Sequence, residues 1–346
     1  MSRMLEEIRQ QPEALARTLA SALRPAERFK RLLEKRRPRM VVLVARGTSD
    51  NAALFGRYLL EIATGLPVSL AAPSITTLYD ARVNYRDALV VSISQSGEST
   101  DTNLVLERAR AQGALTLGIT NESESTLAKI AEHTLFVRAG RERSVAATKT
   151  YTGQMLLMYL LAYALVGRVR IDDLKTLPDA VHRTLALEDE INDLSSRYRF
   201  MHHAVVVGRG LNYSNAFEMA LKLMETCYVV AERFSSADFL HGPIALVEPS
   251  FPVFAFAPPG KTWPSIGETL AKLKGLRAEI VAITDSGNRE VAGSATKLIR
   301  VPVRLKESLT PIPYIIPAQM FAACLAAQKG LNPDQPRTIS KVTLTL

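Results

Sequence analysis

Short apolar runs alternate with amphipathic helical patterns along almost the whole chain. Five such runs lie in each half, and Val and Ile are frequent in them. They are VVLVA, PVSLA, LVVSIS, LTLGIT and TLFVRA within residues 41–139, and AVVVG, YVVAE, PVFAFA, IVAIT and LIRVP within residues 204–302. Near-continuous apolar strands that alternate with helices are typical of βαβ crossovers. The pattern predicts an α/β fold in which parallel strands form sheets with helices on both faces.

The two halves also resemble each other. VVLVARGTSDNAALFGRYLLEI at 41–62 and AVVVGRGLNYSNAFEMALKLME at 204–225 share an apolar strand, an R-G turn and an amphipathic helix. Further along, GALTLGITNESES at 113–125 and RAEIVAITDSGNR at 277–289 keep nearly the same distance from their R-G turns. The chain is therefore predicted to be a tandem duplication of one doubly wound, flavodoxin-like unit with a parallel five-stranded sheet.

This duplication predicts the domain boundaries. We expect a helical extension at 1–38, a first domain at 39–170, a second domain at 201–333 and a C-terminal tail at 334–346. The segment 171–200 is charged and mostly helical, so it is predicted to be a linker and a surface spacer.

Composition narrows the class of protein. With 346 residues, 47% hydrophobic and 22% charged, the chain is long enough for about two globular cores. No apolar run approaches the ~18 residues that a membrane span requires. The N-terminus reads as a charged amphipathic helix rather than a signal peptide, so we expect a cytoplasmic protein. Both cysteines, Cys227 and Cys324, lie in apolar helical stretches, which disfavours a disulfide framework or a cysteine metal site.

The formal net charge of +9 is compatible with two kinds of partner. Nucleic acid would require clustered basic residues, and here they are spread out apart from a short cluster at 35–39. A phosphorylated small molecule explains a mild positive field equally well. We expect no nucleic-acid partner.

The stretch SISQSGESTDT at 92–102 is the most informative polar segment. It joins a predicted buried strand to a helix, where unpaired backbone N–H groups and the helix dipole favour an anion. Side-chain donors at this turn are Ser94, Gln95, Ser96 and Ser99. A P-loop would need a second glycine and a lysine, so a single phosphate fits better than a nucleoside triphosphate. The alternative is a helix N-terminus rich in capping residues. These residues alone leave both open.

Seven ordered motifs resemble the sugar isomerase (SIS) domain family. They are RGTS at 46–49, SQSGEST at 94–100, GITNESESTLA at 118–128, SVAATKTYTGQ at 144–154, ALKLMETCY at 220–228, FLHGPIAL at 239–246 and DQPRTISKVTLTL at 334–346. More closely, they resemble the isomerase half of glucosamine-6-phosphate synthase. That enzyme also carries a glutaminase domain with a terminal cysteine nucleophile, whereas this sequence begins at the isomerase half. The resemblance implies a hexosamine-phosphate deaminase or a related aldose–ketose isomerase.

The resemblance also implies a substrate site. Ser94, Gln95, Ser96 and Ser99 would hold the 6-phosphate of a sugar, and Ser49 would complete that pocket. Thr48, Glu142 and the backbone of Val145 would line the sugar.

Catalytic roles follow in the same way. Lys222 and Glu225 are three residues apart, so on a helix they share a face. Such a pair is most often a solvated salt bridge, but apolar neighbours predict that this helix is buried. The resemblance implies that Glu225 moves the proton between C1 and C2, with Lys222 beside it. It further implies that His241 opens the ring from the neighbouring subunit of a homodimer and that Lys341 contacts the open-chain sugar. The chemistry requires no metal or cofactor.

Two alternatives stay open. SIS domains also serve as sugar-phosphate sensors, although the extension of ~38 residues is short for a complete DNA-binding domain. The sugar is also not fixed by the sequence, since glucosamine, galactosamine and fructosamine 6-phosphates present the same phosphate.

Overall fold

The computed structural model describes residues 2–167, 169–339 and 341. These residues form two compact units. The first-repeat unit comprises the described residues of Gln10–Arg143, Ala147–Thr176 and Thr338–Leu346. The second-repeat unit comprises those of Met1–Arg9, Ser144–Ala146 and Leu177–Arg337. Each unit is described by itself.

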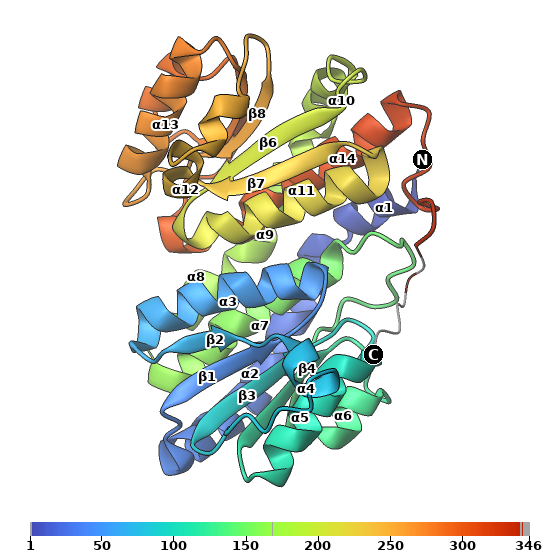
Figure 1. Cartoon of the computed structure of the whole chain (residues 1–346), viewed down its shortest axis with the longest axis vertical. Helices are drawn as coiled ribbons and strands as arrows, with labels where there is room; N and C mark the ends of the chain where they lie inside the picture. Colours follow the sequence, from blue (N-terminus) through green and yellow to red (C-terminus); the bar gives the residue numbers. More distant parts are fainter. Residues whose placement is uncertain (1, 168, 340, 342–346) are drawn as a thin grey trace. The chain divides into compact units, whose positions relative to one another are not determined.

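The first-repeat unit contains a five-stranded sheet in the order β2-β1-β3-β4-β5, and every neighbouring pair is parallel. Its strands are β1 (Met40–Val44), β2 (Val68–Leu70), β3 (Ala88–Ile93), β4 (Leu115–Thr120) and β5 (His133–Phe136). Its helices are α2 (Gln11–Arg36), α3 (Thr48–Thr64), α4 (Pro73–Thr77), α5 (Thr100–Ala111), α6 (Thr126–Ile130), α7 (Lys149–Val166) and α8 (Ile171–Lys175). Helices α2, α3 and α7 pack together, as do α4, α5 and α6, and Figure 1 shows helices on both faces of the sheet.

The second-repeat unit has the same topology, with strand order β7-β6-β8-β9-β10 and parallel pairing throughout. Its strands are β6 (His203–Gly208), β7 (Val230–Ser235), β8 (Pro252–Phe256), β9 (Glu279–Asp285) and β10 (Lys297–Val301). Its α-helices are α1 (Arg3–Arg9), α9 (Leu177–Thr184), α10 (Glu188–Ser196), α11 (Tyr213–Cys227), α12 (Ser236–Leu240), α13 (Trp263–Gly275) and α14 (Pro311–Gln328). Short 3-10 turns are η1 (Leu185–Leu187), η2 (Gly210–Asn212), η3 (Pro243–Leu246), η4 (Glu290–Gly293) and η5 (Glu307–Leu309).

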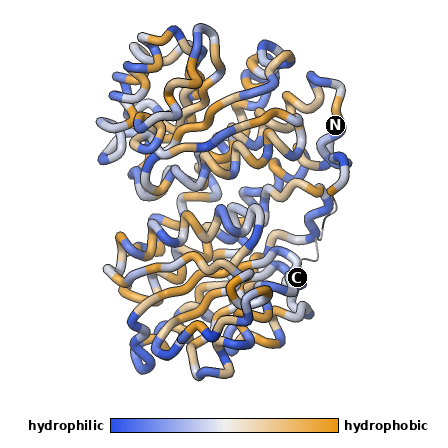
Figure 2. Tube along the Cα trace, in the orientation of Figure 1, coloured by the Kyte–Doolittle hydropathy of each residue, from blue (hydrophilic) through white to orange (hydrophobic). Residues whose placement is uncertain are grey.

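These observations confirm the predicted fold class. The apolar runs form the strands, and Figure 2 shows them as hydrophobic stretches inside each unit. Strands β3 and β4 are buried along their full length, as expected for a sheet covered on both faces. The shared strand order is that of flavodoxin-like doubly wound folds, in which ligands bind beyond the carboxyl ends of the strands.

The two helical segments outside the predicted domains both pack against the units. The extension at 1–38 forms two helices, and α1 groups with the second-repeat unit while α2 groups with the first-repeat unit. The charged pattern at 171–200 predicts a surface spacer. Instead, α9 and α10 pack against α14 and bury Leu177, Val181 and Ile191. Within the described residues, no helix is both long enough and apolar enough to cross a lipid bilayer.

Candidate functional site

The turn that follows β3 in the first-repeat unit is held together by its own hydroxyl groups. The backbone N–H of Gly97 donates to Ser94 Oγ at 3.0 Å, and Ser94 Oγ lies 3.3 Å from Ser99 Oγ. Ser99 is the N-cap residue of α5, but its side chain makes no capping hydrogen bond to the helix. The first-turn N–H groups of a helix have no partner within the helix. The turn therefore gathers several hydroxyl groups at one helix N-terminus.

Gly97 fixes the shape of this turn. Its φ of 70° is disfavoured for residues with a side chain. A Cβ at this position would also collide with the side chain of Ser125. The carbonyl oxygen of Gly97 accepts hydrogen bonds from Asn103 Nδ2 and from the N–H of Leu127, both at 3.0 Å. The turn is thus anchored to α5 and α6.

An ion pair connects the R-G-T-S turn to the start of α5. Arg46 Nε lies 2.7 Å from Asp101 Oδ2, and the Asp101 side chain is buried. Half of the Arg46 side chain is exposed, so its charge faces solvent beside the same helix N-terminus. The sequence pattern does not predict this pair, because the two residues are 55 positions apart.

A pocket of about 870 Å³ opens beside the turn in the first-repeat unit. Its lining includes Gln95, Ser96, Asn121, Arg141, Glu142 and Lys341. Ser94 is buried and takes part in the turn's internal hydrogen bonds. Two of the four predicted phosphate donors therefore line the pocket directly, and they share it with two further predicted site residues.

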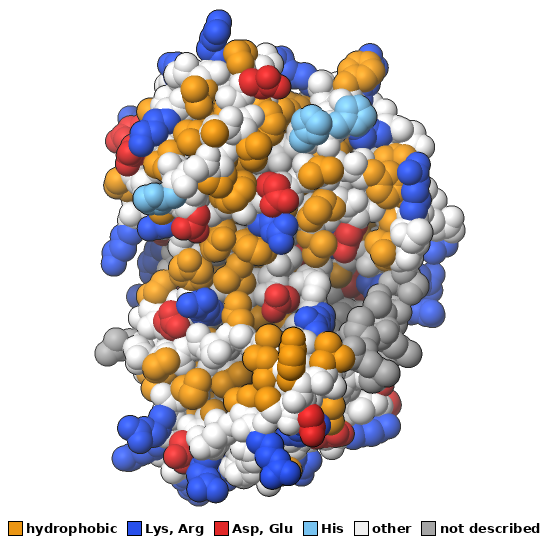
Figure 3. Space-filling view, in the orientation of Figure 1, with side chains coloured by type: hydrophobic (Ala, Val, Ile, Leu, Met, Phe, Trp, Pro, Cys, Tyr) orange, Lys and Arg blue, Asp and Glu red, His pale blue; other side chains and the backbone are white. Residues whose placement is uncertain are grey.

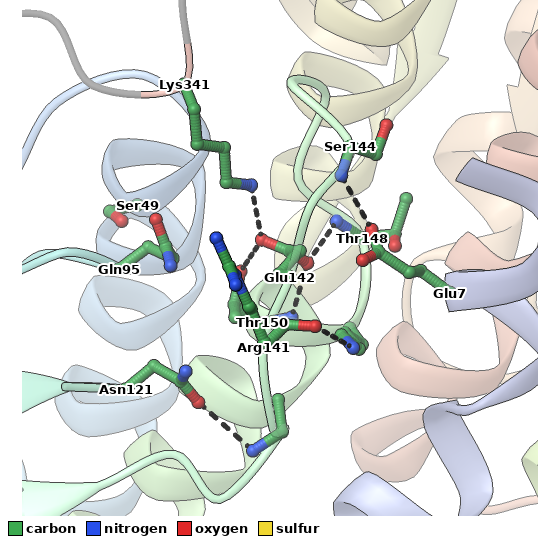
Figure 4. A network of polar contacts seen from close by, with 12 residues as sticks. Glu7, Ser49, Gln95, Asn121, Arg141, Glu142, Ser144, Thr148, Thr150 and Lys341 are labelled. Carbon is green, nitrogen blue, oxygen red and sulfur yellow. Dashed lines mark hydrogen bonds and ion pairs between the residues drawn. The ribbon is translucent and has the colours of Figure 1, made fainter. Parts of the chain in front are cut away.

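The carboxylate of Glu142 is the centre of a buried polar network (Figure 4). Its Oε1 accepts from the N–H of Thr148 at 3.0 Å and of Thr150 at 3.1 Å. Its Oε2 accepts from Thr150 Oγ1 at 2.7 Å and from Lys341 Nζ at 2.9 Å. Glu142 therefore accepts hydrogen bonds from backbone N–H groups at the N-terminal end of α7, and it holds Lys341 of the C-terminal segment at the pocket.

The protonation of Glu142 follows from these contacts. Burial alone would raise its pKa, but the charge of Lys341 and the hydrogen bonds from Thr148 and Thr150 lower it below the ordinary glutamate value. The group is ionised at neutral pH and forms an ion pair with Lys341. Of the predicted tail, residues 340 and 342–346 lie outside the described part of the chain.

The other predicted binding residues occupy different places. Helix α3 begins at Thr48, and the buried Ser49 Oγ accepts a hydrogen bond from Gln154 Nε2 at 3.0 Å. Gln154 is not among the predicted site residues, although it ends the motif at 144–154. Val145 belongs to the short segment Ser144–Ala146, which groups with the second-repeat unit.

Helix α11 of the second-repeat unit carries a buried ionic cluster. Lys222 Nζ lies 2.7 Å from Glu225 Oε2 and 3.4 Å from Glu218 Oε1. The side chains of Lys222 and Glu218 are fully buried, whereas that of Glu225 is 24% exposed. The pair predicted from its spacing is therefore present, and it is not a solvated surface salt bridge. Glu218 is absent from the predicted site residues, although its place one helical turn before Lys222 is a usable signal.

His241 follows α12 and is exposed, and its backbone N–H donates to the carbonyl oxygen of Asp238 at 3.1 Å. The predicted site residues thus fall into two groups. The serine-rich turn, Glu142 and Lys341 belong to the first-repeat unit, whereas Lys222, Glu225 and His241 belong to the second-repeat unit.

The family is decided by comparison with known proteins. The model of the SIS domain matches residues 34–164 and again residues 199–329. The chain belongs to the SIS domain family. It contains two SIS domains, as the internal repeat predicts.

Individual relatives agree with this assignment. Glutamine–fructose-6-phosphate aminotransferase (isomerizing) of Pyrococcus horikoshii is 35% identical over 350 residues, which cover 98% of this chain and 57% of that enzyme. The chain thus spans little more than half the length of this curated relative and is similar to its isomerase half. The solved C-terminal domain of the Francisella tularensis aminotransferase superposes with a TM-score of 0.86 at 29% identity, covering 97% of this chain and 98% of that domain.

A more distant structure shares the fold. Tagatose-6-phosphate ketose/aldose isomerase from Escherichia coli superposes with a TM-score of 0.84 at 23% identity, covering 98% of this chain and 96% of the isomerase. At that identity the likeness shows the fold alone.

Proposed function

We propose that this SIS protein is a phosphosugar isomerase that deaminates an amino-sugar 6-phosphate, with glucosamine 6-phosphate as its substrate and fructose 6-phosphate and ammonia as its products. One observation carries the proposal. The hydroxyl-lined turn at the N-terminus of α5 borders a pocket in which an ion pair holds Lys341. The similarity to the isomerase half of an aminotransferase that makes amino-sugar phosphates supports the same substrate class.

The binding step uses the turn. Hydroxyl groups of Ser94, Ser96 and Ser99, the Gln95 amide and the N–H groups at the start of α5 would hold the phosphate. Backbone dipoles replace the lysine that a P-loop would supply. On the strength of the family resemblance, Ser49 would complete the phosphate pocket, and Thr48, Glu142 and the backbone of Val145 would line the sugar.

The chemical step uses acid–base groups. His241 opens the ring, and Glu225 then removes the proton from C2 of the open-chain sugar and returns a proton to C1. This transfer leaves an imine at C2. Water adds to the imine and releases ammonia, leaving the ketone of fructose 6-phosphate. Lys222 holds Glu225 in position, and Lys341 contacts the open-chain sugar.

The two cysteines do not suit a thiolate nucleophile, which hydrolysis of glutamine in the synthase requires. Burial raises the pKa of Cys227 and of Cys324 to about 11. Both therefore stay protonated thiols at neutral pH.

We further propose a two-fold dimer in which His241 serves the partner's site. The apolar stretch from Ala220 to Val230 gives this less support than its sequence indicates, because most of it is buried within its own unit. Exposed apolar side chains do occur nearby in sequence, at Val230 (63% exposed) and Leu246 (56% exposed).

Basic side chains are dispersed over the face in Figure 3, which favours a small phosphorylated substrate over nucleic acid.

The decisive experiment measures release of ammonia and formation of ketose phosphate from glucosamine, galactosamine and fructosamine 6-phosphates. We expect turnover of the first and, with the unphosphorylated sugars, none. A 6-phosphorylated sugar should also raise the melting temperature, because it binds the native state. The unphosphorylated sugar should leave it unchanged.

The possible results separate the alternatives. Equal thermal shifts with glucosamine and its 6-phosphate would remove the phosphate assignment. A shift specific to the phosphate without any turnover would identify a sugar-phosphate sensor instead of an enzyme. Turnover of only galactosamine 6-phosphate would keep the mechanism and change the substrate. Release of ammonia from only fructosamine 6-phosphate, whose amine is on C1, would keep the class of enzyme but reverse the proton transfer, with an imine at C1.

A further inference from the structure

The second repeat contains a turn that corresponds to the serine-rich turn of the first. Strand β8 occupies the same place in its sheet as β3, and residues 257–263 lead from it into α13. Gly260 matches Gly97, and both have positive φ values, 127° and 70° respectively. Thr262 is the N-cap residue of α13, as Ser99 is of α5. A glycine with positive φ, followed two residues later by a hydroxyl-bearing N-cap residue, therefore occurs at the same place in both repeats.

The side chains of the two turns differ. Three donor residues of the first turn are replaced by residues without side-chain donors, two of which also lack a backbone N–H. Ser94, Gln95 and Ser96 correspond to Ala257, Pro258 and Pro259. A phosphate at the second turn would therefore find fewer hydrogen-bond donors than at the first.

A carboxylate already occupies the donors that remain. Glu307 Oε2 accepts from the N–H of Lys261 at 2.5 Å. Its Oε1 accepts from the N–H of Thr262 at 3.1 Å and from Thr262 Oγ1 at 2.5 Å. A Cβ at Gly260 would collide with this carboxylate, so the glycine also makes room for it. The backbone and hydroxyl donors of the second turn are satisfied by an anion from the same unit.

The anion comes from the segment between β10 and α14. Glu307 begins the 3-10 turn η5, and Thr310 directly precedes α14. Thr310 Oγ1 accepts a hydrogen bond from Asn212 Nδ2 at 2.8 Å, which ties the segment to the R-G turn of this repeat. Asn215 Nδ2 reinforces the tie by donating to the carbonyl oxygen of Pro311 at 2.8 Å. These hydrogen bonds hold in place the segment that carries Glu307.

We propose that the turn at 257–263 is a second anion-binding site whose ligand is the chain's own Glu307 carboxylate. A carboxylate and a phosphate oxygen accept the same N–H and O–H donors at a helix N-terminus. With Glu307 in place, the turn at 257–263 does not bind the phosphate of a sugar, whether that sugar is a substrate or an effector. Each chain then has one phosphosugar site, although the unit that forms it is duplicated.

Counting bound inorganic phosphate by calorimetry tests the proposal. The Glu307→Ala variant should bind about one more phosphate per chain than the wild type, and weakly, because the second turn has few donors. The matched control is Glu290→Ala. Glu290 also bonds the start of α13, but through the indole Nε1 of Trp263 at 2.7 Å rather than through the N-terminal N–H groups. This control should bind the same number of phosphates as the wild type.

The measured quantity is the difference between the number of phosphates bound by Glu307→Ala and the number bound by the wild type. This difference does not depend on whether the first turn binds phosphate. Adding Ser96→Ala should weaken the first site and leave the increment from Glu307→Ala in place. Adding Thr262→Val to Glu307→Ala should abolish it. An unchanged count in Glu307→Ala overturns the proposal.

The wild-type protein provides a second measurement that needs no variant. Hydrogen exchange at the amides of Lys261 and Thr262 should be insensitive to phosphate, because Glu307 holds both groups. Slowing of their exchange by phosphate in the wild type would show that the site is open, which contradicts the proposal. In Glu307→Ala, phosphate should slow the same two amides and raise the melting temperature.

Discussion

At the scale of single residues, the partial exposure of Glu225 matters most. Its side chain is 24% exposed, so the carboxylate is accessible to a ligand. Its partner Lys222 is fully buried, which holds the ammonium group beside that carboxylate. Glu225→Gln keeps the size and polarity of the side chain but removes the base. We expect sugar-phosphate binding to persist, measured as the thermal shift, and turnover to fall by ~10²-fold or more.

Glu232→Gln is a suitable control for this experiment. Glu232 lies on β7, is 53% exposed and pairs with Arg233 at the surface. Its replacement should leave both binding and turnover at wild-type values. Turnover that is unaffected by Glu225→Gln would remove Glu225 from the proposed mechanism.

The lowered pKa of Glu142 predicts a pH dependence of stability. In the unfolded chain this group titrates near its ordinary value of 4.5. Because the folded pKa is lower, its contribution to the unfolding free energy is present above that value and is lost as the pH falls through the folded pKa. Lys341→Met removes the main charge that lowers the folded pKa, so this contribution should be smaller than in the wild type, and its loss should be complete at a higher pH.

Urea unfolding at a series of acidic pH values measures this shift. Lys272→Met serves as the control, since Lys272 pairs with Glu268 on an exposed helix face. Its profile should follow that of the wild type. Coincident profiles for Lys341→Met and wild type would show that the pair with Glu142 contributes nothing in solution.

Local patterns predicted some of these residues and not others. The donor-rich turn and the Lys222–Glu225 pair are readable because their members lie within a few positions of each other. The Arg46–Asp101 pair and the bond from Gln154 to Ser49 join segments 55 and 105 positions apart. Only the fold brings such residues together, so no spacing rule could have revealed them.

At the scale of elements, the turn between β3 and α5 depends on Gly97. Gly113→Ala offers a reference, since Gly113 has a φ of 82° and a Cβ at this position would meet only open space. That change should cost about 1–2 kcal/mol of unfolding free energy, the usual penalty for a left-handed backbone. Gly97→Ala adds the collision with Ser125, so we expect about 2–4 kcal/mol and loss of the phosphate-specific thermal shift.

Chemical denaturation of both variants provides the comparison. Equal losses of stability would mean that the crowding around Gly97 is relieved at no cost. A retained phosphate-specific shift in Gly97→Ala would place the phosphate elsewhere.

The elements themselves were largely readable from the sequence. Apolar runs bounded by turn residues predicted the strands, because burial on both faces requires such runs. Their order in the sheet followed from the fold class. What the pattern could not predict is which sheet each flanking helix joins. Helices α9 and α10 carry many charges, yet each also presents apolar residues that α14 covers.

At the scale of the whole molecule, the proposed dimer has a direct test. Glu225→Ala and His241→Ala should each be nearly inactive alone. If His241 serves the partner's site, refolding the two variants together gives mixed dimers with one intact site. About half of the dimers should be mixed, so activity should return to roughly a quarter of the wild type. A mixture that exchanges subunits and stays inactive would show that His241 does not act across the dimer.

The first helix of the chain is fastened by one of its last described residues. The carboxylate of Asp334 accepts hydrogen bonds from the backbone N–H groups of Arg3 at 2.8 Å and Met4 at 2.9 Å. Helix α1 also packs on α14. A ribosome makes α1 well before α14 and Asp334, so during synthesis the side chains of Met4 and Ile8 cannot become buried until about 300 further residues have emerged. Helix α1 is therefore synthesised before the elements that cover it, but it can reach its final place only after them.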